Sequence, residues 1–119
     1  MGKRAEEFNA FRRRMNARIL AEDNRVIKRV FSVDSLTYED GALPAKTKEL
    51  LGLTASMVLR CDDCVSYHIG QCIESGCSKD EIVEAMSVAL VVGGTIVIPH
   101  MRRAIEFLDE LLADKERPR

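Results

Sequence analysis

The segment RCDDCVSYH, residues 60–68, contains the residue types best suited to chemistry. Cys61 and Cys64 form a CxxC pair, and His68 follows the second cysteine by four positions. At about 100° per residue, a helix would place these three side chains on one face, and Cys72 would extend the same stripe. Cysteine and histidine on a shared face suit either zinc binding or thiol redox chemistry.

Helix geometry argues against zinc. Cys61 and His68 would lie about 10 Å apart along a helix that rises about 1.5 Å per residue. A structural zinc ion instead needs four ligands arranged as a tetrahedron, at about 2.0–2.3 Å. The only other histidine is His100, which is interpreted as a capping or exposed residue at a helix start. We therefore expect no metal site.

A dithiol site fits the spacing better. A CxxC at the start of a helix lets the two sulfur atoms approach to bonding distance, and the positive end of the helix dipole stabilises a thiolate there. His68, one turn beyond Cys64, can exchange a proton with that thiol. Asp62 and Asp63 act in the opposite direction, because nearby negative charge disfavours a thiolate. The segment thus predicts a redox pair but not an unusually acidic cysteine.

A carboxylate partner for His68 is predicted in the preceding helix. If the chain turns back near residues 59–62, Glu49 lies about as far before the turn as His68 lies after it. Glu49 belongs to a segment rich in Leu, Val and Met, so its carboxylate would be poorly solvated and could orient the imidazole. The alternative is a surface carboxylate paired with Lys46 or Lys48. The candidate site residues are Cys61, Cys64, His68 and Glu49.

Three nearby residues receive structural interpretations. Cys72 is expected to be a core residue, although a role as a further thiol stays open. Cys77 precedes the predicted N-cap Ser78 and would form the hydrophobic staple of the next helix. Tyr67 is expected to point away from the cysteine and histidine face and to serve packing.

Helical periodicity runs through most of the chain. A stripe of apolar residues predicts a first helix over about residues 3–31, and turn signals predict a connection over 31–42 that could contain one short helical turn. Further helices are expected over about 44–59 with Pro44 in the first turn, 63–75, 78–93 and 95–113. We predict a single all-α domain over residues 1–119, with five to six helices and a core over about 40–113.

Composition limits the classes of function. Lys and Arg number 18 against 19 Asp and Glu, so net charge gives no support for nucleic-acid binding, and the arginine-rich face of the first helix is interpreted as solvated or ion-paired. The most apolar stretch, residues 86–99, is shorter than the roughly 20 residues of a membrane span and is expected to be buried helix. The N-terminal residues do not resemble a secretory signal, which predicts a cytoplasmic protein with reduced cysteines.

Several segments resemble a known family. Between about Asp40 and Gly94, the patterns DGALPAKTKELLGL, CDDCVSYH, GCSKDEIVEAM and a closing GG are similar to the carboxymuconolactone decarboxylase-like superfamily and, within it, to the alkyl hydroperoxidase D (AhpD-like) branch. The specific part is CxxCxxxH with a glutamate twelve residues upstream. The resemblance implies an AhpD-like all-α fold, a trimeric or hexameric assembly and peroxidase activity.

The resemblance also implies roles for the site residues. Cys64 would attack the peroxide, Cys61 would resolve the resulting sulfenic acid to a disulfide, and Glu49 and His68 would relay protons. The sequence departs from the pattern at Asp63, where the better-studied hydroperoxidases have histidine. This difference bears on peroxidase efficiency rather than on the dithiol chemistry.

The leading hypothesis is a thiol-dependent hydroperoxidase, or dithiol–disulfide oxidoreductase, that needs no cofactor. Its partners would be a small hydroperoxide and an external thiol or disulfide-reducing protein, with neither nucleic acid nor a membrane involved. The chain is also expected to form a homo-oligomer. Two alternatives stay open, namely a decarboxylase-type enzyme acting on a small lactone acid and a non-catalytic oligomeric helical protein with structural cysteines.

Overall fold

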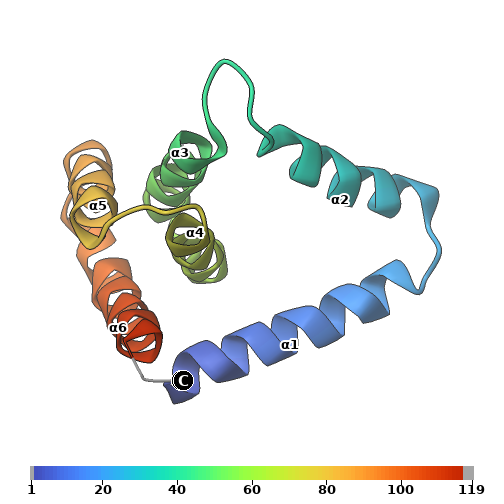
Figure 1. The fold of residues 1–119 in the computed structure, drawn as a ribbon, viewed down its shortest axis with the longest axis horizontal. Coiled ribbons are helices and arrows are strands. Elements are labelled where there is room, and N and C mark those ends of the chain that lie inside the picture. Colours follow the sequence, from blue (N-terminus) through green and yellow to red (C-terminus); the bar gives the residue numbers. More distant parts are fainter. Residues whose placement is uncertain (1, 117–119) are drawn as a thin grey trace.

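The computed structural model describes residues 2–116 and is all-helical over that range (Figure 1). The elements are α1 (Lys3–Leu20), α2 (Arg25–Thr37), α3 (Ala45–Val58), α4 (Asp62–Glu74), α5 (Lys79–Gly93), the 3-10 turn η1 (Thr95–Val97) and α6 (Ile98–Lys115). The prediction of an all-α fold with five to six helices is confirmed. The predicted domain also includes residue 1 and residues 117–119, which lie outside the described residues.

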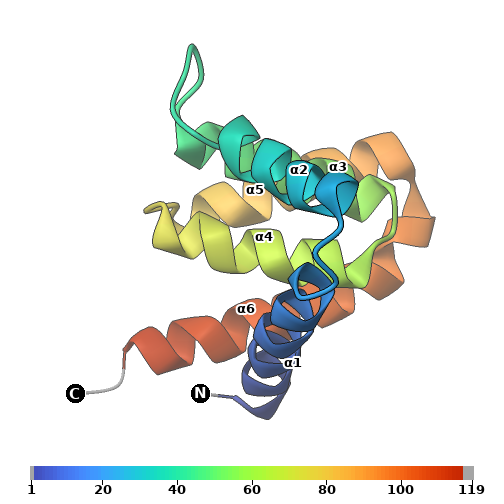
Figure 2. The ribbon, with the colours of Figure 1, turned by 90° about the vertical axis from the view of Figure 1, so that its right-hand side faces the viewer.

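Helices α3, α4, α5 and α6 form the packed part of the molecule. Helix α3 packs against both α4 and α5, and α6 packs against α4 and α1. Helices α1 and α2 run along one side of this group (Figures 1 and 2). The largest fully buried side chains come from all four packed helices and include Phe107, Leu53, Met57, Ile69 and Ile82. This core holds α3 and α4 rigidly beside each other.

The prediction of one continuous helix over residues 3–31 is wrong. The chain breaks between α1 and α2, where Asp23 has a φ of 57°. Asn24 then caps α2, because its side-chain oxygen accepts hydrogen bonds from the backbone N–H groups of Val26 and Ile27, both at 3.0 Å. This local cap outweighs the apolar periodicity that continues across the break. Helix α2 extends to Thr37, well into the segment predicted as a connection.

Several local predictions in the second half are confirmed. Ser78 caps α5 in a reciprocal capping box, accepting from Glu81 N–H at 3.1 Å while the Glu81 carboxylate accepts from Ser78 N–H at 2.8 Å. Gly76 ends α4 with a φ of 89°, a conformation that favours glycine. Pro99 lies in the first turn of α6, where a missing N–H group costs little. Pro44 is the N-cap of α3 rather than a residue of its first turn.

Two apolar surfaces are exposed. The expectation that residues 86–99 are buried holds only in part, because Met86, Ala89 and Val97 are buried while Val91 and Val92 are 86% and 68% exposed. Helix α2 contributes no buried residue. Its exposed apolar side chains are Val26, Val30, Val33 and Leu36. No described helix is long and apolar enough to cross a membrane.

Candidate active site

The α3–α4 hairpin positions the histidine and its carboxylate partner. The chain turns between the two helices at residues 59–61, where Arg60 takes a left-handed backbone conformation with a φ of 60°. Cys61 N–H donates to the carbonyl of Ser56 at 3.1 Å and closes the turn. Glu49 on α3 and His68 on α4, 19 residues apart in sequence, are thereby brought into contact.

Glu49 and His68 form a buried pair. Glu49 Oε1 lies 2.8 Å from His68 Nδ1, and the two residues are only 4% and 8% exposed. The alternative of a lysine partner for Glu49 does not occur, because Lys46 pairs with Glu81 at 3.0 Å and Lys48 donates to two backbone carbonyl groups. A carboxylate held on Nδ1 fixes the orientation of the ring and leaves Nε2 for other partners.

A glycine makes room for the imidazole. Gly52 lies on α3 one turn after Glu49, and a Cβ atom at this position would come within 2.6 Å of His68 Cε1. Glycine inside a helix is normally unfavourable by roughly 0.5–1 kcal/mol relative to alanine. The close approach of the ring to the α3 backbone gives this glycine a packing reason.

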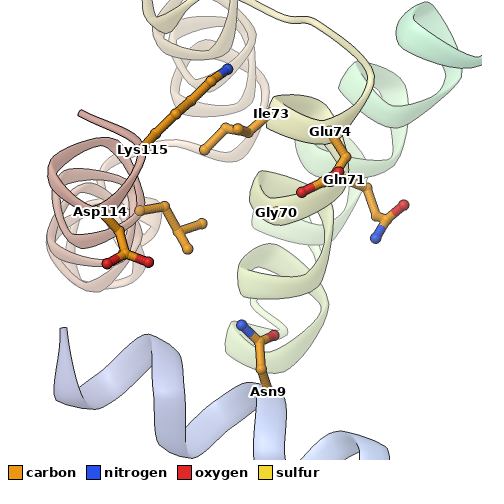
Figure 3. Close-up of a pocket in the computed structure, with 8 residues that line it drawn as sticks. Asn9, Gly70, Gln71, Ile73, Glu74, Asp114 and Lys115 are labelled. Carbon is orange, nitrogen blue, oxygen red and sulfur yellow. The ribbon is translucent and has the colours of Figure 1, made fainter. Parts of the chain in front are cut away.

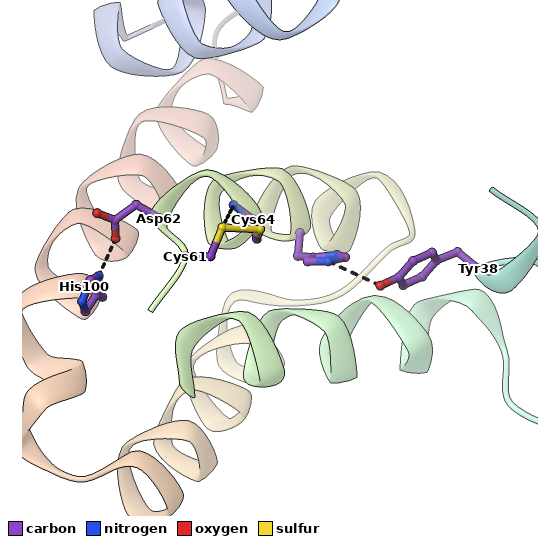
Figure 4. The surroundings of a disulfide bond; sticks show 6 residues. Tyr38, Cys61, Asp62, Cys64 and His100 are labelled. Atoms are coloured by element: carbon purple, nitrogen blue, oxygen red, sulfur yellow. Dashed lines mark hydrogen bonds and ion pairs between the residues drawn. A yellow bond between two sulfur atoms is a disulfide. The ribbon is translucent and has the colours of Figure 1, made fainter. Parts of the chain in front are cut away.

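Cys61 and Cys64 are joined by a disulfide, with their Cα atoms 5.3 Å apart (Figure 4). Cys61 is the N-cap of α4, and its Sγ accepts a hydrogen bond from Cys64 N–H at 3.3 Å. Cys64 is exposed, whereas Cys61 is half-buried. The pair therefore lies at the start of the helix, and Cys64 is the more exposed residue of the two.

Cys64 and His68 open into one cavity of about 400 Å³ between α1, α2 and α4. Within the described residues, no hydrogen bond joins the Cys64 and His68 side chains. The two are related by lining the same cavity. Its other wall is largely the apolar face of α1. The lining residues from α1 and α2 are Phe8, Phe11, Arg12, Met15, Asn16, Ile19 and Asp34.

The expectation that Tyr67 points away from the site is wrong. Tyr67 lines the same cavity, with its ring centroid 5.2 Å from that of His68, and the Arg12 guanidinium lies 4.1 Å from the Tyr67 centroid. Because α1 covers this flank of α4, a residue beside the cysteine face becomes part of the wall. Burial raises the pKa of the Tyr67 hydroxyl against the opposing effect of Arg12.

The interpretation of His100 as only a capping or exposed residue is also wrong. His100 Nδ1 lies 2.8 Å from one oxygen of Asp62 (Figure 4). Arg103 Nε donates to the other oxygen at 2.8 Å. Burial opposes ionisation of Asp62, but these bonds outweigh it and lower the pKa of the carboxyl. His100 and Arg103 thus offset the negative charge of Asp62 beside Cys61. Asp62 therefore disfavours a nearby thiolate less than the sequence suggests.

A model of the Carboxymuconolactone decarboxylase family matches residues 25–107. The chain belongs to this family. A crystal structure of a Thermotoga maritima protein superposes with a TM-score of 0.90 at 50% sequence identity, covering 93% of this chain and 97% of that one.

A second crystal structure of the Thermotoga maritima protein has a TM-score of 0.88 at 50% identity, and covers 92% of this chain and 93% of that one. That protein is described as a carboxymuconolactone decarboxylase family protein whose involvement in the antioxidative response has been suggested. A Legionella pneumophila member of the family shares the fold, with a TM-score of 0.84 at 21% identity, covering 92% of this chain and 97% of that one. An uncharacterized protein of Cupriavidus necator is 29% identical over 63% of this chain and 66% of its own length. The matched region thus spans just under two thirds of that relative.

The two remaining cysteines of this carboxymuconolactone decarboxylase family member are free and buried. Cys72 is fully buried in the core, as expected, and burial raises its thiol pKa well above the usual range. Cys77 is 8% exposed, and burial likewise raises its pKa. Burial and a raised pKa both disfavour the thiolate, the form of cysteine that attacks.

Sequence reasoning missed one neighbour of the site. The Tyr38 hydroxyl lies 3.4 Å from His68 Nε2 (Figure 4). Tyr38 falls in the segment predicted as a connection, and no local pattern indicates that it approaches His68.

The other large cavity lacks the chemistry of the first. It measures about 520 Å³ between α1, α4 and α6, and Figure 3 shows its lining without cysteine or histidine. Among residues 2–116, no group of three or more His, Cys, Asp or Glu side chains is arranged to hold a metal ion. The cysteine and histidine cavity is therefore the candidate active site.

Proposed function

We propose that this member of the carboxymuconolactone decarboxylase family is a thiol-dependent hydroperoxidase, or dithiol–disulfide oxidoreductase, working through Cys61, Cys64, His68 and Glu49. One observation carries the proposal: an exposed, disulfide-forming Cys64 shares a cavity with a histidine whose other nitrogen is held by a buried carboxylate. The antioxidative association suggested for the Thermotoga maritima relative supports the same class of reaction.

In the proposed cycle, the Cys64 thiolate attacks one peroxide oxygen of ROOH. An S–O bond forms, the O–O bond breaks, and the leaving RO⁻ takes a proton to become ROH, so Cys64 becomes a sulfenic acid. Cys61 then attacks that sulfur, forming the disulfide and releasing water. Two external thiols restore the pair and are themselves oxidised to a disulfide. No cofactor is needed.

His68 would act as the proton carrier of this cycle. It takes the proton of the Cys64 thiol and returns it to the leaving alkoxide, while Glu49 stabilises the protonated ring. The cavity suits a small organic hydroperoxide because apolar side chains of α1 face the reacting sulfur. We place the protein in the cytoplasm, where thiol donors or a disulfide-reducing protein can regenerate the pair. Nucleic acid and membranes have no part in the proposal.

A homo-oligomer, a trimer or hexamer, is also part of the proposal. The exposed apolar side chains of α2 and of residues 88–96 support it, since large exposed apolar patches mark interaction surfaces. Sedimentation equilibrium is expected to give a mass of three or six chains. A monomer at micromolar concentration would contradict the assembly without affecting the proposed chemistry.

The decisive experiment counts thiols. Fully reduced protein, with four cysteine thiols per chain, is mixed with tert-butyl hydroperoxide and then assayed with a thiol reagent under denaturing conditions. We expect the loss of the Cys61 and Cys64 thiols and the survival of Cys72 and Cys77. Cys64→Ser should abolish this loss, and Cys61→Ser should stop at a sulfenic acid that dimedone traps.

Cys72→Ala is the matched control, because it removes a cysteine further along α4 that is buried and outside the proposed reaction. It should react with peroxide like the wild type. Undiminished turnover in Cys64→Ser would sink the proposal. Activity on a small lactone acid that survives loss of both Cys61 and Cys64 would instead favour decarboxylase-type chemistry, and inert thiols without turnover would favour a structural protein.

A further inference from the structure

Both ring nitrogens of His68 have partners while the disulfide is closed. Nδ1 contacts Glu49 at 2.8 Å, and Nε2 contacts the Tyr38 hydroxyl at 3.4 Å. Tyr38 is the C-cap of α2, a helix with no buried residue. The nitrogen that would serve Cys64 is thus occupied by a residue from the least buried helix of the fold.

The hydrogen-bond roles follow from the chemistry of the three groups. A carboxylate oxygen only accepts, so Nδ1 carries a hydrogen toward Glu49 and the neutral ring offers a lone pair at Nε2. The Tyr38 hydroxyl can donate to that lone pair. It can also accept from Nε2–H when the ring is protonated. Burial, with the negative charges of Glu49 and Asp34, raises the pKa of Tyr38 and keeps its hydroxyl protonated.

A distance of 3.4 Å makes the Tyr38 bond a weak one. The Glu49 bond, at 2.8 Å, is short and charge-assisted. One nitrogen is therefore held firmly and the other loosely. The Tyr38 bond is thus the one of the two that is more easily exchanged.

We propose that Tyr38 is a positioning residue that holds His68 Nε2 while the Cys61–Cys64 disulfide is closed and yields this nitrogen to Cys64 when the pair is reduced. This inference rests on the proposed function of the same site. A disulfide sulfur has no proton to exchange with an imidazole, so Tyr38 occupies the nitrogen in that state. A Cys64 thiol does have a proton to give, and it competes with Tyr38 for Nε2.

Tyr38 also bears on the reopening of the disulfide. When a reductant thiolate attacks Cys61 Sγ, the new S–S bond forms there, the Cys61–Cys64 bond breaks, and Cys64 leaves with the electron pair and takes the proton of His68 Nε2. The reductant supplies the electrons. Before this step, the Tyr38 hydroxyl stabilises the protonated ring by accepting a hydrogen bond from Nε2–H.

The titratable and charged groups around the ring are Glu49 from α3, Tyr38 and Asp34 from α2, Cys64, Asp63 and Tyr67 from α4, and Arg12 from α1.

The chain offers a matched pair of variants. The rings of Tyr38 and Tyr67 lie 5.4 Å and 5.2 Å from the His68 ring, but only the Tyr38 hydroxyl contacts Nε2. Tyr38→Phe and Tyr67→Phe each remove one hydroxyl and keep the ring. Any difference between them at Nε2 therefore reports the hydrogen bond rather than packing.

The measurement is the ¹⁵N resonance of His68 Nε2 in labelled protein, with His100→Gln used to assign the two histidines. In the disulfide form we expect Tyr38→Phe to move this resonance toward that of a free lone pair and Tyr67→Phe to leave it in place. After reduction, Tyr38→Phe should have little effect. Tyr38→Phe should also slow opening of the disulfide by excess dithiothreitol about threefold, the loss of one weak hydrogen bond, and should slow it more than Tyr67→Phe does.

Equal resonance shifts in Tyr38→Phe and Tyr67→Phe would overturn the inference, as would a Tyr38→Phe shift of the same size in both redox states. Neither readout uses a peroxide. If peroxide turnover is absent but the redox-dependent shift is present, the proposed function fails and the exchange at Nε2 stands. If turnover is present without the shift, only the exchange fails.

Discussion

Glu49→Gln is expected to lower the rate at which hydroperoxide oxidises the reduced protein by about 100-fold, the lower end of what general acid–base catalysis contributes. Glutamine keeps the size of the side chain, and its carbonyl can still accept from His68 Nδ1. It removes the negative charge that stabilises the protonated His68 ring. Stopped-flow measurement of thiol loss under excess tert-butyl hydroperoxide gives the rate directly.

Stability separates this effect from misfolding. Replacing a buried carboxylate by a neutral isostere that still hydrogen-bonds should leave the free energy of unfolding within about 1 kcal/mol of wild type. Glu84→Gln is the matched control, because Glu84 is exposed on α5, and its rate should stay within about twofold of wild type. A Glu49→Gln protein that reacts at the wild-type rate would remove Glu49 from the proposed relay.

Gly52→Ala is expected to damage both the chemistry and the stability. The added Cβ would lie 2.6 Å from His68 Cε1, 2.8 Å from Nε2 and 2.9 Å from Nδ1. The α3 and α4 backbones cannot separate easily, because Leu53 and Ile69 are fully buried between them and the rest of the core. The ring must therefore move, which breaks the 2.8 Å contact with Glu49.

We expect Gly52→Ala to lower the rate of peroxide-driven thiol loss by about 100-fold, as for Glu49→Gln. Overpacking should cost about 1–3 kcal/mol, and the better helix propensity of alanine recovers only about 1 kcal/mol of this. Urea unfolding measures the net loss. Stopped-flow mixing with hydroperoxide measures the rate.

Gly70→Ala provides the control on α4. A Cβ there meets no atom within 4 Å, so alanine should raise the stability by up to about 1 kcal/mol and leave the rate unchanged. If Gly52→Ala were as stable and reacted as fast as Gly70→Ala, the close approach of residue 52 to His68 would not constrain the ring.

Residues close in sequence account for what could be predicted before the structure was known. Cys64 and His68 fall within one helix, so the helical repeat places them on one face, and Cys61 is the N-cap of that helix. Glu49 could be found because a hairpin with a short turn pairs residues at equal distances from that turn. The capping box of Ser78 and Glu81, and the helix end at Gly76, are likewise set by neighbours in the chain.

Periodicity failed where a single cap competed with it. The apolar stripe of the first 31 residues continues through Asp23 and Asn24, and only the side-chain bonds of Asn24 reveal that a second helix begins there. Because α2 extends to Thr37, Tyr38 is its C-cap and contacts His68. An error of a few residues in a helix boundary thus hid a neighbour of the site.

By itself, the sequence determined the all-α class, the disposition of Cys61, Cys64 and His68, and the Glu49 partner, because local geometry governs each of them. Tertiary structure alone decided that Tyr38 meets His68 across 30 residues and that His100 meets Asp62 across 38. It also made Tyr67 a wall of the cavity by laying α1 over it. Such contacts depend on how whole helices pack, and side-chain packing over long chain separations leaves no repeating pattern in a single sequence.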